Sequence, residues 1–300
     1  MGTTEKKPHI LVLSASTGGG HMRAAEGIEK CLLERHPSID VTNVDMMNHV
    51  SWLFRTLYVD SYMDMMKHHR RLYELLYTMM DKEPEKMPMQ RFRLWLQWLN
   101  SVSAHKALLK LGPDHIICTH FTAAEMLSRA RRKGYNIPPT SVVVTDFDVH
   151  WMWIHRALDE FFVADHEAAA RLATRGVAEE HIHVTGIPVC PGFARTYDAQ
   201  EQKKALGLTP GTLTLMLMAG GFGVSSIDRT ARRLLGHFGH LQLIAVAGRN
   251  EALRASLDRV AAEFPGRLAA IGFTTEVEKY MAASDLIISK PDGLTTSECM

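Results

Sequence analysis

The chain has 300 residues, of which 46% are hydrophobic and 22% are charged, and its formal net charge is +1. This composition is typical of a globular protein of about two domains, and a charge so close to zero argues against a nucleic-acid partner. The polar N-terminus lacks the pattern of a signal peptide, and no apolar run reaches the roughly 20 residues that span a bilayer. Four scattered cysteines favour a reducing compartment. We therefore expect a cytoplasmic protein whose membrane contacts are peripheral.

Short apolar runs alternate with amphipathic stretches along most of the chain. In the first part we expect strands at Ile10–Ser14, His115–Thr119, Ser141–Thr145, Glu160–Ala164 and His181–Thr185. The helices expected there are 22–34, Ala123–Lys133 and Glu167–Arg175. After residue 192 the pattern starts again, with strands expected at Thr212–Met218, Leu241–Ala247, Leu268–Phe273 and Leu286–Ser289. This alternation predicts an α/β fold with parallel sheets, in two Rossmann-like domains at 1–192 and 200–300 joined by a hinge near 189–205.

The segment from 46 to 110 interrupts this alternation and is expected to be a helical insertion. It holds nine of the 17 methionines and many aromatic residues, and residues 51–110 carry 10 Lys and Arg against 6 Asp and Glu. Basic and aromatic side chains in one helix are typical of a lipid interface. Methionine-rich stripes are more often packed in a core, and composition alone favours that second interpretation.

Residues 14–21, Ser-Ala-Ser-Thr-Gly-Gly-Gly-His, lie between the first expected strand and the first expected helix. Glycines allow a ligand to approach the backbone, and the N-terminus of a helix attracts anions. His21, at the lip of this turn, is a candidate base near neutral pH. The spacing matches neither the dinucleotide fingerprint nor the Walker loop. Taken alone, the three glycines indicate a ligand site and a simple tight turn equally well.

Four more polar clusters follow expected strands, at the position where open α/β sheets bind their ligands. These clusters are residues 119–121, 145–155, 220–226 and 292–298. His150 and His155, with Asp146 and Asp148 nearby, could bind a metal, but no third ligand is evident and the tryptophans between them indicate packing. A serine hydrolase is less favoured still, because the chain has no G-x-S-x-G motif.

Taken together, seven motifs resemble those of the monogalactosyldiacylglycerol synthase and processive diacylglycerol glucosyltransferase family, which is related to the peptidoglycan N-acetylglucosaminyltransferase. In order they are Ser16–His21, Pro113–His120, Val144–His155, Thr185–Pro188, Met218–Gly223, Ala247–Asn250 and Lys290–Glu298. The resemblance implies a GT-B fold, in which two Rossmann-like domains face each other across a cleft. It also implies a UDP-sugar-dependent hexosyltransferase that makes a membrane glycolipid.

The resemblance assigns roles to individual residues. His21 would take the proton of the diacylglycerol hydroxyl, which displaces UDP with inversion, and Asp146 is the second catalytic candidate. The nucleotide-sugar candidates are Gly19, Gly20, Gly221, Ser225, Arg249, Phe273, Thr295, Thr296 and Glu298. The lipid-acceptor candidates are Thr119, His120, His150 and Trp153. The implied partners are UDP-glucose or UDP-galactose, diacylglycerol and the cytoplasmic face of a membrane, and the resemblance implies no cofactor, metal or nucleic acid. Because diacylglycerol lies in the membrane, the resemblance also favours the interfacial interpretation of segment 46–110.

The chain departs from the family pattern in two places. Asp292 stands where the family usually has glycine, and its charge would repel a phosphate. The family also continues past Glu298 with a loop that contacts the sugar, so we expect the C-terminal domain to be truncated and the choice between glucose and galactose to stay open. Two alternatives remain: a UDP-GlcNAc transferase acting on a lipid-linked carbohydrate, and a non-catalytic fragment that binds lipid or nucleotide.

Overall fold

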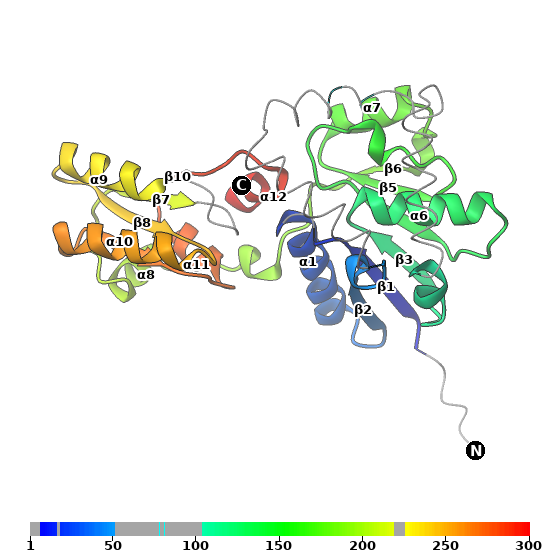
Figure 1. The fold of residues 1–300 in the computed structure, drawn as a ribbon, viewed down its shortest axis with the longest axis horizontal. Coiled ribbons are helices and arrows are strands. Elements are labelled where there is room, and N and C mark those ends of the chain that lie inside the picture. The colour runs from blue at the N-terminus through cyan, green and yellow to red at the C-terminus, as the bar shows by residue number, and fades with distance from the viewer. Residues whose placement is uncertain (1–6, 17–18, 52–77, 79–80, 82–103, 219–225) are drawn as a thin grey trace, which may run out of the picture. The chain divides into compact units, whose positions relative to one another are not determined.

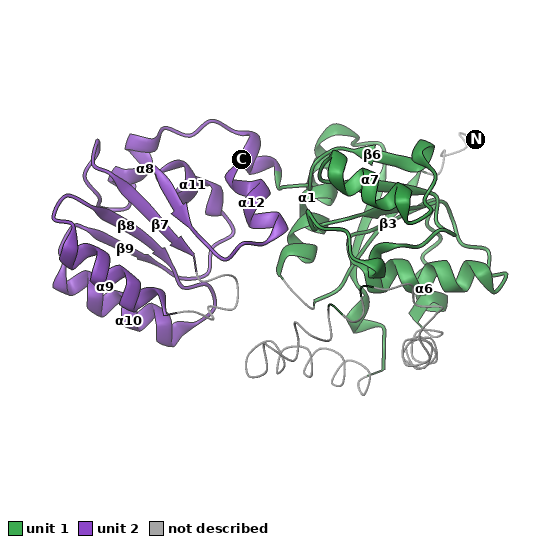
Figure 2. Cartoon of the chain, turned by 90° about the horizontal axis from the view of Figure 1, so that it is seen from above, with its two compact units in different colours: residues 1–190 green, residues 191–300 purple. Residues whose placement is uncertain are grey.

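The computed structural model of the chain describes residues 7–16, 19–51, 78, 81, 104–218 and 226–300. The chain divides into two compact units, Met1–Cys190 and Pro191–Met300, coloured green and purple in Figure 2. Most of the predicted insertion at 46–110 lies outside the described residues. Among the residues that are described, no helix combines the length and the apolar character needed to cross a bilayer.

Unit 1 is built on a six-stranded sheet with the strand order β2-β1-β3-β4-β5-β6 (Figure 1). Its strands are β1 His9–Ser14, β2 Asp40–Asp45, β3 His115–Cys118, β4 Thr140–Val143, β5 Glu160–Val163 and β6 Ile182–Val184. Every neighbouring pair is parallel. Parallel strands end at the same edge of a sheet, and β1, β3 and β4 are neighbours. The loops that follow these three strands therefore lie next to one another.

Helices connect the strands of unit 1. The longer ones are α1 Gly19–Arg35, α6 Phe121–Arg132 and α7 His166–Thr174, and the short 3-10 helices are η1 Met46–Asn48, η4 Trp151–Trp153 and η5 Glu179–His181. Residues 104–109 are also helical. The α6 and α7 helices stop in the same way, because Gly134 and Gly176 follow their C-caps with φ angles of 85° and 87°. Glycine adopts this left-handed conformation without the steric cost of a Cβ atom.

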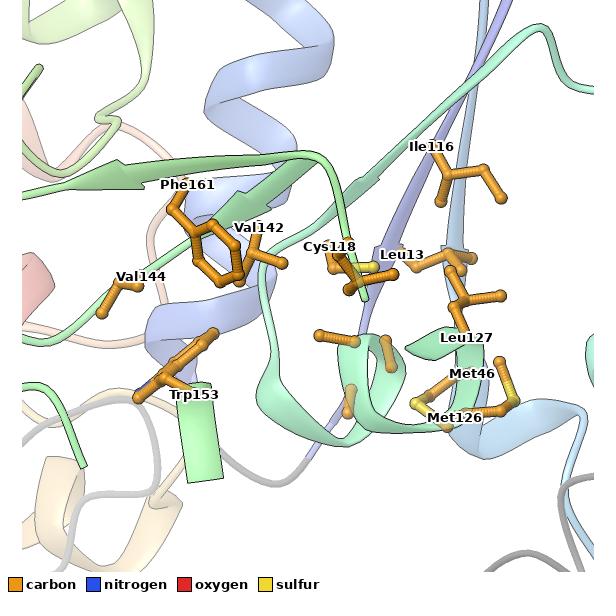
Figure 3. Packing of buried hydrophobic residues seen from close by; sticks show 14 of the residues in the cluster. Leu13, Met46, Ile116, Cys118, Met126, Leu127, Val142, Val144, Trp153 and Phe161 are labelled. Carbon is orange, nitrogen blue, oxygen red and sulfur yellow. The ribbon is translucent and has the colours of Figure 1, made fainter. Parts of the chain in front are cut away.

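The largest buried cluster of unit 1 joins the sheet to helices α6 and α7. Leu11 and Leu13 alternate with Val12 along β1, so they point to the face that carries the large buried cluster. The cluster includes Ile116, Cys118, Val142, Phe161, Met126, Leu127, Met46 and Trp153, most of which Figure 3 shows. Trp153 is only 1% exposed. The turn that carries it is therefore fixed to the core, since burying so large a side chain stabilises the fold by several kcal/mol (about 3 by transfer).

Unit 2 is built on a four-stranded parallel sheet with the strand order β10-β7-β8-β9. The strands are β7 Thr214–Met218, β8 Gln242–Val246, β9 Leu268–Ile271 and β10 Leu286–Ile288. The helices are η6 Pro191–Ala194, α8 Ala199–Ala205, α9 Ile227–His237, α10 Glu251–Glu263, α11 Val277–Ala282 and α12 Gly293–Cys299. Separate apolar clusters lie on the two faces of the sheet, one with α9 and α10 and the other with α11 (Figure 2).

The predicted α/β class with parallel sheets is confirmed, but one described strand, β2, and one described α-helix, α8, were not predicted. Strand β2 reads Asp-Val-Thr-Asn-Val-Asp, and its polar residues hide it because it lies at the edge of the sheet and is only partly buried. Helix α8 falls inside the segment predicted as a hinge. Its sequence, Ala-Gln-Glu-Gln-Lys-Lys-Ala, has no apolar stripe, and its start is fixed by the Asp198 carboxylate, which accepts the N–H groups of Gln200 and Glu201.

Candidate active site

His21 lies in the first turn of α1 and is half-buried. Its Nδ1 atom is 3.1 Å from the carbonyl oxygen of Thr119 and 2.7 Å from the hydroxyl oxygen of Thr145. Thr119 directly follows β3, and Thr145 follows β4. Three segments that are far apart in the sequence thus meet at the carboxyl edge of the sheet, with the imidazole between them.

These contacts decide which nitrogen of His21 carries the proton. A carbonyl oxygen can only accept, so the contact with Thr119 assigns the hydrogen to Nδ1, which donates. The hydroxyl oxygen of Thr145 is a second acceptor for the same N–H. The neutral ring then has its lone pair on Nε2, which is the arrangement a general base requires.

Thr119 holds His21 through its backbone and through its side chain. The residue is completely buried, and its N–H donates to the carbonyl of Leu13 at 2.9 Å. Its hydroxyl donates to the carbonyl oxygen of His21 at 3.0 Å. Thr119 therefore fastens the first turn of α1 to the sheet. The predicted contact of Thr119 with a lipid acceptor stays a prediction.

A second imidazole, that of His120, lies against His21. The two ring centroids are 4.5 Å apart and the planes are nearly perpendicular, at 81°. His120 caps α6, because its Nδ1 accepts the N–H of Thr122 at 3.1 Å, and only 1% of the residue is exposed. Burial, and then the charge of His21, hold the pKa of His120 well below its usual value. His120 is thus neutral at neutral pH.

Asp146 and Trp153 complete the group around His21. The indole Nε1 of Trp153 donates to Oδ2 of Asp146 at 3.1 Å, and the indole centroid is 6.1 Å from that of His21. Phe121 meets the indole edge to face at 5.7 Å. The hydrogen bond fixes the direction of the Asp146 carboxylate. Five of the predicted residues, His21, Thr119, His120, Asp146 and Trp153, are therefore brought together.

His150 lies beside this group as the cap of the η4 turn. Its Nδ1 accepts the N–H of Met152 at 3.1 Å, and the residue is 4% exposed. The structure thus gives His150 a part in shaping the turn that carries Trp153. Its predicted contact with a lipid acceptor stays a prediction, as it does for the buried His120 and Trp153.

The predicted nucleotide-sugar residues are distributed over several places. Gly19 and Gly20 begin α1, whereas Gly221 and Ser225 lie outside the described residues. In unit 2, the Arg249 guanidinium carbon is 4.4 Å from the ring centroid of Phe273, and the phenyl group is 55% exposed. These two residues follow β8 and β9, so they share the carboxyl edge of the second sheet.

Helix α12 carries the remaining nucleotide-sugar candidates, Thr295, Thr296 and Glu298, and all three are partly buried. Asp292 caps this helix, and its Oδ1 accepts the N–H of Thr295 at 2.9 Å. Thr295 was expected to contact the nucleotide-sugar. The carboxylate that replaces the usual glycine therefore uses a donor and adds a negative charge at this position.

Several residues at the site were not predicted as site residues. Thr145 was placed in a polar cluster without a role. Asp45, at the end of the unpredicted strand β2, accepts the N–H groups of Ser16 at 3.1 Å and Met47 at 3.0 Å, and so holds the loop before the glycines. If β2 had been predicted, Asp45 would have been recognised as a polar residue at the end of a strand, like the other site candidates. No group of three or more possible metal ligands occurs in the described part of the chain, and the expected absence of a metal stays a prediction.

Solved structures with the same fold include proteins of the GT-B type. The chain aligns with MurG from Acinetobacter baumannii at a TM-score of 0.51 and 14% identity, over 97% of this chain and 75% of that one. With UDP-GlcNAc 2-epimerase from Neisseria meningitidis, solved with UDP-GlcNAc bound, the TM-score is 0.54 at 12% identity, over 97% of this chain and 79% of that one. At these identities the likeness shows the fold.

Sequence relatives are closer. The chain is 30% identical to the processive diacylglycerol β-glucosyltransferase of Bacillus pumilus over 98% of this chain and 75% of that protein. The proteins of the same name from Bacillus subtilis and Staphylococcus epidermidis are 28% and 29% identical, over 96% and 99% of this chain and 74% of each relative. The family described as monogalactosyldiacylglycerol (MGDG) synthase matches residues 21–189, which begin at His21 and contain the whole group around it. The chain belongs to the monogalactosyldiacylglycerol synthase family.

Proposed function

We propose that this protein is a hexosyltransferase that moves glucose or galactose from a UDP-sugar to diacylglycerol, with inversion at the anomeric carbon. Relatives that are named processive diacylglycerol β-glucosyltransferases support the donor and acceptor classes. One observation from the site carries the mechanism: the Nδ1–H of His21 is held by the Thr119 carbonyl and the Thr145 hydroxyl. In this proposal unit 1 binds the lipid and unit 2 binds the nucleotide.

The reaction needs a base because an alcohol is a weak nucleophile at neutral pH. Nε2 of His21 takes the hydroxyl proton while the oxygen attacks the anomeric carbon. The bond between that carbon and the diphosphate oxygen breaks, its electron pair leaves with UDP, and the proton stays on Nε2. The resulting imidazolium is stabilised because its Nδ1–H already points at two oxygen acceptors.

Binding of the donor is proposed for the carboxyl edge of the second sheet. The exposed Phe273 ring offers an apolar face for a base, and Arg249 beside it supplies a positive charge. Thr295, Thr296 and Glu298 extend this site along α12. Asp292 weakens it, since a negative charge at the start of the helix opposes a diphosphate. The proposal needs no metal, because N–H and hydroxyl donors can stabilise the leaving group.

Diacylglycerol is dissolved in a bilayer, so the enzyme has to work at a membrane surface. Segment 51–110 carries 10 basic residues against 6 acidic ones and includes tyrosines and tryptophans. Side chains of these kinds favour the interface of an anionic membrane. We therefore place the protein on the cytoplasmic face of the membrane as a peripheral enzyme, with this segment in contact with lipid.

The test is glycolipid synthesis from defined components. The protein is incubated with radiolabelled UDP-glucose, UDP-galactose or UDP-GlcNAc and vesicles that contain diacylglycerol, and the lipid phase is analysed. Labelled glycosyl-diacylglycerol from one of the first two donors supports the proposal. Transfer only from UDP-GlcNAc to a lipid-linked carbohydrate contradicts it, and so does binding of UDP in a calorimeter with no transfer from any donor.

A further inference from the structure

A charged cluster outside the site connects residue 81 to the turn that carries Trp153. Oδ1 of Asp81 accepts the N–H of Trp151, 70 residues further along the chain, at 2.9 Å. Arg175, at the C-cap of α7, donates to both carboxylate oxygens of Asp81, at 3.1 and 3.3 Å. The same guanidinium donates to the carbonyl of Val149 at 2.7 Å. One carboxylate thus ties together three distant segments of unit 1.

The cluster is well shielded from water and charged. The Arg175 side chain is 15% exposed, that of Asp81 is 35% exposed, and the guanidinium lies 5.0 Å from the centre of the Trp151 ring. Burial alone raises the pKa of Asp81, but the Trp151 N–H, the Arg175 guanidinium and His150, whose Nε2 is 3.9 Å from Oδ1, outweigh it and lower that pKa. The carboxylate is therefore ionised at neutral pH. Removing its charge would leave a largely buried guanidinium without its main counter-charge.

The η4 turn carries this constraint to the site. Its first residue, Trp151, is held by Asp81, and its last residue, Trp153, lies 6.1 Å from His21 between ring centroids and donates to Asp146. A turn of three residues is too short to absorb a shift at one end without moving the other. We infer that Asp81 is a positioning residue: through Arg175 and Trp151 it fixes the turn, and through the turn it fixes the Trp153 indole against His21 and, by its hydrogen bond, the Asp146 carboxylate. Its effect on turnover rests on the proposed function.

The chain offers a matched control one helical turn away. Asp148 also forms an ion pair with an α7 arginine, Arg171, but its side chain is 74% exposed. Asp81→Asn and Asp148→Asn therefore each remove the carboxylate charge that pairs with an arginine, at the C-cap of α7 in the first case and within α7 in the second. Only the first change touches the turn that holds Trp153. A third variant, Asp81→Asn with Arg175→Gln, removes both charges and avoids an unpaired buried cation if the single variant does not fold.

The first measurement is independent of the substrate. The indole N–H signals of the five tryptophans are recorded by ¹⁵N NMR of the whole chain, and Trp153→Phe identifies the signal of Trp153. We expect this signal to shift in Asp81→Asn and in the double variant, and to keep its position in Asp148→Asn. An unmoved Trp153 signal in folded Asp81→Asn, or in the folded double variant, overturns the inference.

The second measurement separates kcat from KM in glycolipid synthesis. We expect Asp81→Asn to lower kcat about tenfold, since small misplacements at a site are costly, with the KM for the UDP-sugar unchanged. In a Trp153→Phe background the same change should have little further effect, because its route through Trp153 is gone. A full additional loss in that background overturns the inference. If the native protein makes no glycolipid, the proposed function fails, while the NMR result still decides the role of Asp81.

Discussion

At the amino edge of each sheet an aspartate is paired with a cation, Asp159 in unit 1 and Asp285 in unit 2, and these two aspartates make the same contacts. In unit 1, Oδ2 of Asp159 accepts the N–H of Thr140 at 2.7 Å and a guanidinium N–H of Arg131 at 2.8 Å. In unit 2, Oδ2 of Asp285 accepts the N–H of Thr214 at 2.8 Å and the ammonium of Lys203 at 3.0 Å. Each aspartate also donates its own N–H to the carbonyl of the same threonine.

At the carboxyl edges, the described residues of the two sheets differ. In unit 1 that edge is a closely packed group of imidazole and indole rings around His21. In unit 2 it presents an exposed arginine–phenylalanine pair at Arg249 and Phe273. The comparison teaches that the amino edges maintain the common fold, whereas the carboxyl edges carry the chemistry that differs. Changes at the first edge should alter stability, and changes at the second should alter catalysis or binding.

The largest effect that tests this division is expected at Asp285. Asp285→Asn leaves Lys203, whose side chain is 3% exposed, without its carboxylate, and we expect the free energy of unfolding of unit 2 to fall by about 2 kcal/mol. Asp159→Asn should cost less, because Arg131 is more exposed and keeps three carbonyl acceptors, those of Ala157, Ile137 and Pro138, whereas Lys203 keeps the carbonyl of Thr212. Urea unfolding measures both. An equal or opposite ranking would contradict the comparison.

Acid titration provides the control for that variant. Burial raises the pKa of Asp285, but hydrogen bonds from Thr214 and Lys203 outweigh it. The pKa in the folded chain is therefore below 3.8, the ordinary value of an aspartate. A lowered pKa stabilises the fold above the unfolded value, and this stabilisation is lost as pH falls through the folded value. Asp285→Asn should therefore lack that acid-dependent part of the stability. If the free energy of unfolding of Asp285→Asn falls with pH below about pH 4 as steeply as that of the native chain, the ion pair does not stabilise the fold.

A smaller effect, on turnover alone, is expected at Thr145. Thr145→Val removes the hydroxyl that lies 2.7 Å from Nδ1 of His21 and keeps the shape of the side chain. Nδ1 keeps the Thr119 carbonyl but loses the Thr145 hydroxyl, and we expect kcat to fall about tenfold. Thr145→Ser restores the hydroxyl and should restore most of the rate. If valine and serine behave alike in steady-state assays, the hydroxyl does not orient the base.

The smallest effect concerns the donor site at Asp292. Asp292→Asn removes a negative charge from the start of α12 and keeps a side-chain oxygen that can cap the helix. We expect UDP to bind about two- to threefold more tightly, which corresponds to the usual weight of one charge at a helix end. Calorimetry with UDP measures the change. Unchanged or weaker binding would remove α12 from the proposed diphosphate site.

Much of the fold could be predicted because buried parallel strands are continuous apolar runs. Ile10–Ser14 and Leu241–Ala247 are examples, and the structure places β1 and β8 there. Strand β2 and helix α8 could not be found in this way, since neither has the apolar pattern of a buried element. Their existence depends on tertiary contacts: β2 pairs with β1 along its whole length, and α8 is fixed at its start by Asp198.

The site was predictable as a set of neighbours, because strand ends share one edge of a parallel sheet. That reasoning brought together His21, Thr119, His120 and Asp146. It could not predict that Thr119 and His120 are buried, since burial depends on how α1 and α6 pack over the loops. Nor could it predict Asp81, which reaches the η4 turn from 70 residues away and follows no predicted strand.

Replacement of His21 tests the central claim most directly. His36 follows the other end of the same helix and is exposed, so His36→Ala is a matched control for His21→Ala. We predict that His21→Ala lowers the rate of glycolipid synthesis by about 100-fold or more, as expected for a lost general base, and leaves UDP binding unchanged. His36→Ala should keep the native rate. A folded His21→Ala protein that turns over as fast as His36→Ala would contradict the account.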